Sequence, residues 1–137
     1  GKTYIPGGLI WGQRLLSKDA PYTEATGYNE RVNGQKVRKI LVLMTDGVNT
    51  LSPNYPYHQG ADTALSNNLT AEICTNIKAK GIQIYSVAFQ VPDETTKTML
   101  QTCASGPSNY FDAEDEQKLQ ESFEKIAKDF NPLRLTR

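Results

Sequence analysis

The carboxylate of Asp46 is the side chain of this sequence that is best placed to do chemistry. Five apolar residues, 40–44, and Thr45 precede it, and Gly47 follows it directly. An apolar run of this length that ends at a turn residue predicts a strand buried on both faces. Ligands of open α/β sheets bind at the carboxyl ends of the strands. Asp46 therefore lies where such a fold would bind a ligand, although a plain turn aspartate at a strand end fits the same pattern.

The other reactive residue types point away from catalysis. His58 is the only histidine, and no partner is placed beside it by spacing, so we expect an exposed loop histidine. The sequence has no G-x-S-x-G motif, and Gly7-Gly8 is too short a signal for a phosphate-binding loop. We therefore expect no enzymatic activity. Cys74 and Cys103 are too few for a zinc site, and the residues alone leave two buried thiols and one disulfide equally open.

Size and composition indicate one soluble globular domain. The chain has 137 residues, of which 38% are hydrophobic and 22% charged. Fifteen basic residues balance fifteen acidic ones, which argues against a nucleic-acid partner. No apolar stretch approaches the roughly 18 residues that cross a bilayer. Because the chain lacks an initiator methionine, we expect it to be part of a longer protein.

The apolar periodicity predicts alternating helices and strands. We expect helices over residues 6–16, 68–80 and 94–104, and a last helix that Asp115 caps and Pro132 ends. The second helix would be capped by Asn67 or Asn68. Strands are predicted over residues 37–45, 82–91 and 110–112, separated by polar loops at 17–36 and 47–68. This alternation favours right-handed βαβ units and a mainly parallel sheet.

Two glycines weaken the first predicted helix. Gly8 and Gly12 are four residues apart, and each costs about 1 kcal/mol relative to alanine in a helix. Close packing of the helix against a neighbouring element would compensate for that loss. The glycines therefore predict a helix that approaches another element closely.

Several segments resemble the von Willebrand factor A domain. They are LVLMTDG, a helix ending in Ala79-Lys80-Gly81, and IQIYSVAF; in addition, Gly1-Lys2-Thr3 is similar to the second metal loop of that family. The resemblance covers nearly the whole chain and implies a three-layer, Rossmann-like α/β fold with a mainly parallel sheet. The first strands of the family and its D-x-S-x-S motif would precede Thr3. We therefore expect residues 1–137 to form a single, partial domain that is incomplete at its N-terminal side.

The resemblance also implies a metal-ion-dependent adhesion site. In that site Thr3 and Asp46 would be two of five metal-binding side chains, and hydroxyl and carboxylate oxygens suit Mg²⁺. Since the sequence contains no D-x-S-x-S, we expect Mg²⁺ or Mn²⁺ in the full-length protein and weak or no binding by this chain. In the family, the open metal position accepts a carboxylate from a partner protein. The loop after Asp46 would form the seat of that partner, with Asn49, Thr50, Tyr55 and Tyr57.

A narrower resemblance is to the bacterial TadE/TadG-like pilus assembly proteins. It rests on GGLIWGQRLLS, LQTCASGPSNYFDA and the terminal NPLRLT. It implies a location on the periplasmic or cell-surface side of the inner membrane. It also implies an N-terminal membrane anchor outside this chain and a protein partner of the pilus or cell surface. Disulfides persist in such a compartment, which favours a Cys74–Cys103 bridge.

The leading hypothesis is thus an extracytoplasmic protein-interaction or adhesion module. One alternative is a structural scaffold whose metal site is not functional, and a less favoured one is a hydrolase or nucleotide-binding domain. A missing part of the sheet would leave an apolar strand edge open, so we also expect this chain to self-associate.

Overall fold

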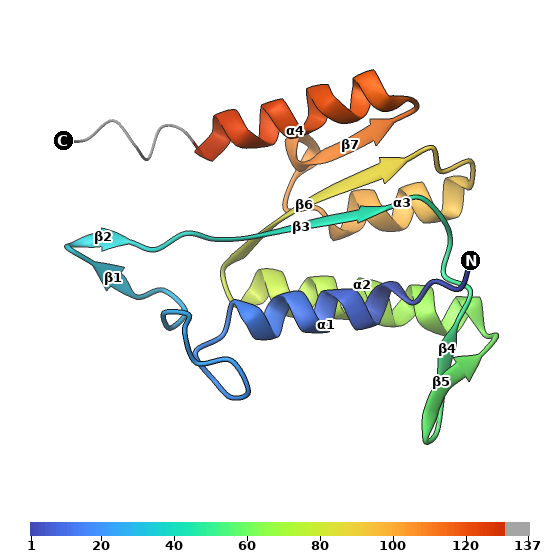
Figure 1. Ribbon diagram of the computed structural model, residues 1–137, viewed down its shortest axis with the longest axis horizontal. Coiled ribbons are helices and arrows are strands. Elements are labelled where there is room, and N and C mark those ends of the chain that lie inside the picture. Colours follow the sequence, from blue (N-terminus) through green and yellow to red (C-terminus); the bar gives the residue numbers. More distant parts are fainter. Residues whose placement is uncertain (131–137) are drawn as a thin grey trace.

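The structure, a computed structural model, describes residues 1–130 and has three layers (Figure 1). The central sheet consists of β3 (Lys39–Thr45), β6 (Ile82–Phe89) and β7 (Tyr110–Ala113), in the order β3-β6-β7 with both pairs parallel. Helices α1 (Ile5–Leu15), α2 (Thr63–Ala79) and α3 (Glu94–Cys103) pack on one face. Helix α4 (Glu116–Phe130) covers the other face. The predicted α/β class and mainly parallel sheet are confirmed.

The prediction that the strand before Asp46 is buried on both faces is wrong. Strand β3 is an edge strand, and Val42 and Met44 are 39% and 42% exposed. Helix α4 packs over β6 and β7, so it leaves this face of β3 open. The central strand β6 has the expected burial instead, because it has a neighbour on each side and helices on both faces.

Helix α1 packs closely against β3 through a glycine. Its buried residues include Ile5 and Leu9, and Pro6 occupies the first turn, where proline is tolerated. A Cβ atom added at Gly12 would lie 2.9 Å from Cδ1 of Leu41, whereas one added at Gly8 would meet nothing within 4 Å. The close approach predicted for this helix therefore occurs at one of its two glycines.

Helix α2 begins five residues earlier than predicted. The carboxylate of Asp62 accepts a hydrogen bond from the backbone N–H of Leu65 at 2.9 Å and caps the helix. The predicted caps, Asn67 and Asn68, lie inside the helix. The cap of α4 is as predicted, since Asp115 accepts from the N–H of Lys118 at 2.7 Å. The predicted end of that helix at Pro132 lies outside the described residues.

Both predicted loops contain hairpins. Strands β1 (Arg31–Val32) and β2 (Gln35–Lys36) are joined by Asn33 and Gly34, both with positive φ. Positive φ at both central residues is the requirement of a tight hairpin turn. Strands β4 (Ser52–Asn54) and β5 (Tyr57–Gly60) form a second hairpin that projects from the body (Figure 1). Both segments were predicted to be loops because they are polar. The two pairs of strands were not predicted because each strand is very short.

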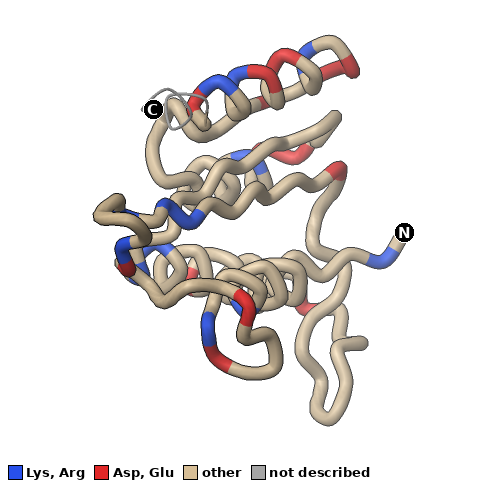
Figure 2. Tube along the Cα trace, turned by 60° about the vertical axis from the view of Figure 1, so that its left-hand side comes forward, with Lys and Arg blue, Asp and Glu red and all other residues tan. Residues whose placement is uncertain are grey.

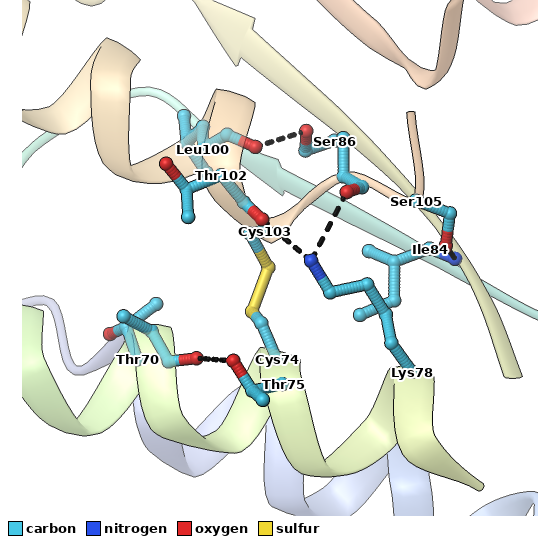
Figure 3. Close-up of a disulfide and its surroundings, with 12 residues drawn as sticks. Thr70, Cys74, Thr75, Lys78, Ile84, Ser86, Leu100, Thr102, Cys103 and Ser105 are labelled. Carbon is cyan, nitrogen blue, oxygen red and sulfur yellow. Dashed lines mark hydrogen bonds between the residues drawn. A yellow bond between two sulfur atoms is a disulfide. The ribbon is translucent and has the colours of Figure 1, made fainter. Parts of the chain in front are cut away.

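A disulfide joins α2 to α3. Cys74 and Cys103 are bonded, with their Cα atoms 5.1 Å apart, and both are buried (Figure 3). Beside the bridge, the ammonium of Lys78 donates hydrogen bonds to the carbonyl oxygens of Thr102 and Ala104 at 2.7 and 3.3 Å. The 3₁₀ helix Pro107–Asn109 then leads into β7. The disulfide expected from the family resemblance is confirmed.

Candidate functional site

Asp46 lies at the carboxyl end of β3 and is exposed to solvent. The turn around it is formed by its neighbours. The hydroxyl of Thr45 donates to the carbonyl oxygen of Gly47 at 2.9 Å and accepts from the N–H of Gly47 at 3.3 Å. Within residues 1–130, the carboxylate of Asp46 makes no hydrogen bond or ion pair, so both its oxygens are available to a ligand.

Thr3 lies against the loop that follows Asp46. Its N–H donates to the hydroxyl of Thr50 at 2.6 Å, and its carbonyl oxygen accepts from the N–H groups of Thr50 and Leu51 at 2.9 and 3.1 Å. The Thr3 side chain is half-buried, and its hydroxyl has no hydrogen-bond partner in the described part of the chain. The structure therefore brings Thr3 and Thr50 together, and it leaves the Thr3 hydroxyl available.

Asn49 does not face a partner, which corrects its assignment to the partner-binding loop. Its side chain is 0% exposed. The amide oxygen accepts from the N–H of Ile5 at 2.8 Å, and the amide nitrogen donates to the side chains of Asn67 and Thr70 at 2.9 and 3.3 Å. The hydrogen-bonding groups of this amide are therefore occupied inside the protein. Their bonds join the β3–β4 loop to α1 and α2.

The two tyrosines of the predicted partner-binding loop lie on the β4–β5 hairpin. Tyr55 is 98% exposed and Tyr57 is 63% exposed. The carboxyl end of β3, the N-terminus and this hairpin all lie at the same end of the molecule (Figure 1). His58 follows Tyr57, and its ring packs on Tyr4 with the ring centroids 5.0 Å apart. These aromatic side chains are accessible to a partner at the end of the molecule that carries Asp46.

Sequence reasoning missed a polar pocket beside this loop. The pocket has a volume of about 310 Å³ and is lined by Val48, Asn49, Thr63, Asn67, Asp93, Thr95 and Thr96. Asp93 caps α3, because its carboxylate accepts from the N–H of Thr96 at 2.7 Å. The side chain and backbone of Thr96 lower the pKa of Asp93 below its ordinary value, so this carboxylate stays ionised. An aspartate just before a predicted helix is a signal that the sequence contains, at Asp93. The position of Asp93 beside Asn49 depends on the fold.

Asp46 and Thr3 carry the types of oxygen that a magnesium site would require. Mg²⁺ prefers oxygen ligands in octahedral geometry and keeps several waters. The Asp46 carboxylate and the Thr3 hydroxyl are suitable ligands. No group of three or more His, Cys, Asp or Glu side chains in the described part of the chain could hold a metal ion. These two oxygens would therefore leave most of the coordination shell to water.

Charges are mixed over the surface. Acidic and basic residues both occur along α4, whereas β4, β5 and β6 carry neither (Figure 2). Of the described helices, none is both long and apolar enough to span a membrane.

Comparisons with known proteins agree with this architecture. Residues 22–125 match the von Willebrand factor type A domain. The fold is similar to that of the pilus adhesin SpaC from Lactobacillus rhamnosus GG, with a TM-score of 0.68 and 18% identity over 94% of this chain and 19% of that one. It is also similar to proximal thread matrix protein 1 from the mussel byssus, with a TM-score of 0.54 and 20% identity over 93% of this chain and 24% of that one.

This chain thus spans less than a quarter of the length of either structure. Comparison with curated proteins gives no significant match. The family match covers most of the sequence and places the TDG segment, residues 45–47, within the matched range. The chain belongs to the von Willebrand factor type A domain family.

Proposed function

We propose that this chain is part of an adhesion or protein-interaction module that binds its partner through a divalent metal ion beside Asp46. The observation that carries the proposal is the position of Thr3. Four hydrogen bonds join its backbone to Thr50 and Leu51, in the loop that follows Asp46. Thr3 and Asp46 are far apart in the sequence, and each has an available side-chain oxygen. The hydrogen bonds of Thr3 therefore place it beside the loop that follows Asp46.

In this proposal Asp46 and Thr3 supply two oxygen ligands to Mg²⁺ or Mn²⁺. The remaining protein ligands would come from a D-x-S-x-S motif elsewhere in the protein, since residues 1–137 contain none. A carboxylate of the partner would complete the shell. The exposed Tyr55 and Tyr57 would contact the partner next to the metal, because aromatic side chains are enriched at protein interfaces.

The proposed setting is the outer side of a bacterial inner membrane. The similarity to the fold of a pilus adhesin and the buried disulfide support an extracytoplasmic protein partner, because disulfides persist in oxidising compartments. A TadE/TadG-like protein with a membrane anchor outside this chain fits that setting. The role that we propose is non-catalytic.

Titration of the chain with Mn²⁺, followed by electron paramagnetic resonance, tests the metal-binding part of this proposal. We expect weak, millimolar binding, because two protein oxygens leave the shell mostly to water. Asp46→Asn should abolish it, Thr3→Val should weaken it, and Glu72→Gln, which removes an exposed charge on α2, should leave it unchanged. Equal binding by the Asp46→Asn variant would refute a site at Asp46, and submicromolar binding would refute an incomplete shell.

The adhesive role is tested in a longer form of the protein, if one carries the D-x-S-x-S ligands that this proposal requires. There we expect adhesion to its partner to be lost with a chelator and with Asp46→Asn. Adhesion that persists under both conditions would favour the structural scaffold with a non-functional metal site.

A further inference from the structure

The polar pocket beside Asn49 has the features of a ligand site. Its lining residues come from three segments, which are the β3–β4 loop, the first turns of α2, and the first turn of α3 with its cap. Strand β3 leads into the first segment, β6 leads into the third, and the two strands are neighbours in the sheet. The pocket therefore lies on the β6 side of β3, away from the open edge where further strands of the domain would join. We call this feature the α2–α3 pocket.

A buried hydroxyl without a partner lines the α2–α3 pocket. The side chain of Thr96 is 0% exposed, and its hydroxyl makes no hydrogen bond within residues 1–130. The hydroxyl lies close enough to Asp93 to lower the pKa of that carboxylate, but without the geometry of a hydrogen bond. Buried polar groups in folded proteins are nearly always paired, because an unpaired group costs free energy. A ligand in the pocket would supply the partner that this hydroxyl lacks.

The α2–α3 pocket carries a single charge, which is negative. Asp93 is the only acidic residue that lines it, and no lysine, arginine or histidine does. The Oδ2 atom of Asp93 accepts from the N–H of Thr96, whereas the Oδ1 atom makes no hydrogen bond or ion pair in the described part of the chain. Because the pKa of Asp93 is lowered, the carboxylate stays ionised at neutral pH. These groups favour a cationic ligand.

The helix ends beside the pocket do not turn it into an anion site. Helix N-termini attract anions, and the N-termini of α2 and α3 both contribute lining residues. Each end is already capped by a carboxylate, that of Asp62 on α2 at 2.9 Å and that of Asp93 on α3 at 2.7 Å. Glu94 adds a further negative charge in the first turn of α3. An anion would therefore meet repulsion from these carboxylates.

The available acceptors fit an ammonium group better than a guanidinium group or a metal ion. A guanidinium pairs with a carboxylate through two parallel hydrogen bonds, and Oδ2 of Asp93 is already bonded to the N–H of Thr96. An ammonium has three N–H donors and needs only one bond to the carboxylate. The hydroxyls of Thr63, Thr95 and Thr96 line the same pocket and can accept from the other donors. Mg²⁺ and Ca²⁺ require a larger set of strong oxygen ligands than one carboxylate supplies.

The position of the pocket indicates where such an ammonium group comes from. Val48 and Asn49 line the pocket, and they stand two and three positions after Asp46 in the same loop. A protein bound at a metal beside Asp46 would therefore lie next to the pocket. We propose that the α2–α3 pocket binds a lysine side chain of that protein partner, with the ammonium group bonded to Asp93 and Thr96. The choice of partner rests on the proposed function, whereas the affinity of the pocket for a lysine side chain does not require the metal.

NMR titration of the isotope-labelled chain in the presence of a chelator tests this inference. The probe is lysine with its α-amino and carboxyl groups capped, as they are in a peptide chain, and norleucine capped in the same way is its uncharged counterpart. We expect capped lysine to shift the backbone N–H signals of Thr95 and Thr96 and the side-chain amide signals of Asn67, saturably and with a millimolar Kd. Capped norleucine should shift none of them. Binding of capped lysine should weaken as salt rises, because salt screens the attraction between the charges.

Asp93→Asn separates the charge of the site from the cap of α3. Asparagine caps helices about as well as aspartate does, so the start of the helix should be retained. We expect this variant to bind capped lysine at least about tenfold more weakly, as for the loss of a charge-assisted hydrogen bond. The matched control is Asp115→Asn, which removes the same charge from the cap of α4, on the opposite face of the sheet, and should bind as the unmodified chain does. Circular dichroism checks that both variants are folded.

Thr96→Val tests the role of the unpartnered hydroxyl. Valine has nearly the same shape as threonine and lacks the hydroxyl. We expect weaker binding of capped lysine and no loss of stability to urea, because no hydrogen bond within the chain is removed. Lower stability together with unchanged binding would mean that the hydroxyl serves the fold alone, and it would overturn the inference.

Other results would also overturn the inference. They are the absence of saturable shifts with capped lysine, equal binding by the Asp93→Asn variant, and tighter binding of capped arginine. Tighter binding of putrescine would assign the pocket to a small diamine, and loss of Mn²⁺ binding in Asp93→Asn would assign it to a metal ion; either would overturn the inference as well. Asp46→Asn should leave the binding of capped lysine unchanged, so failure here is distinct from failure of the metal-dependent function.

Discussion

The side-chain oxygen of Asn49 accepts a hydrogen bond from the backbone N–H of Ile5 at 2.8 Å, across 44 positions of sequence. Backbone N–H groups in the first turn of a helix have no partner within the helix, so this bond stabilises the start of α1. The same amide contacts α2 through Asn67 and Thr70. One buried side chain therefore fixes the start of α1, and with it the neighbouring Thr3, against the loop after Asp46.

Replacement of Asn49 by alanine should lower the free energy of unfolding by about 1–3 kcal/mol, since it leaves the Ile5 N–H buried without its partner. Urea denaturation followed by circular dichroism measures the change. The matched control is Asn68→Ala, on an exposed position of α2, which should change stability by less than about 0.5 kcal/mol. Equal effects of the two substitutions would contradict the role of Asn49.

The two glycines of α1 should respond in different ways to alanine. Gly8→Ala should stabilise the protein by about 0.5–1 kcal/mol, because the added methyl group meets nothing within 4 Å and the helix gains propensity. Gly12→Ala should give less stabilisation or a net loss, because its methyl group would lie 2.9 Å from Leu41, a buried side chain. Thermal unfolding of the two variants checks this order, and the reverse order would contradict it.

The Cys74–Cys103 bridge should account for a large part of the stability. It joins residues 29 positions apart, and the chain-entropy model gives about 3–4 kcal/mol for a loop of that size. The Cys74→Ser/Cys103→Ser double variant should unfold at correspondingly lower urea concentrations. Under denaturing, non-reducing conditions the unmodified chain should not react with a maleimide, and labelling of both cysteines would rule out the bridge.

Tyr85 should make the protein sensitive to alkaline pH. Burial, followed by the hydrogen bond to Asp129, raises the pKa of this phenol above its ordinary value of 10.0. Because the folded-state pKa is the higher one, the stabilisation is complete below about pH 10 and is lost as pH rises further. Ultraviolet titration should show Tyr85 ionising above the ordinary phenol pKa of 10.0. The Tyr85→Phe variant should lose stability less steeply above pH 10, and an unchanged slope would contradict this prediction.

The open edge of β3 should promote self-association. Within residues 1–130, one side of β3 has no neighbouring strand and presents its backbone hydrogen-bonding groups, and the exposed Val42 and Met44 lie on the same strand. Light scattering at tens of micromolar should detect dimers or larger species. Val42→Lys should reduce them, whereas Val32→Lys, on the distant β1–β2 hairpin, should not. A monomer at all concentrations would refute this prediction.

The helices and long strands could be predicted because their signals are local. The stripe formed by Leu119, Phe123, Ile126 and Phe130 predicted α4, although Phe123 is 42% exposed. The apolar run before Asp46 predicted β3. The start of α2 was missed because Asp62 and the two later asparagines are all good caps, and sequence alone does not rank them. The burial of β3 was misjudged since burial depends on neighbouring strands, which the residues of β3 do not specify.

The sequence by itself determined the α/β class, the place of Asp46 at a strand end, and the family resemblance that singled out Thr3 and the cysteine pair. These features follow from periodicity and motifs within short segments. Only the tertiary structure decided that Thr3 is held against Thr50, that Asn49 is a buried support rather than a partner contact, and that Asp93 and Thr96 line a pocket beside Asn49. Each of these depends on contacts between segments 40 or more positions apart, and such contacts form only when α1 packs beside α2 and β3, and β6 beside β3.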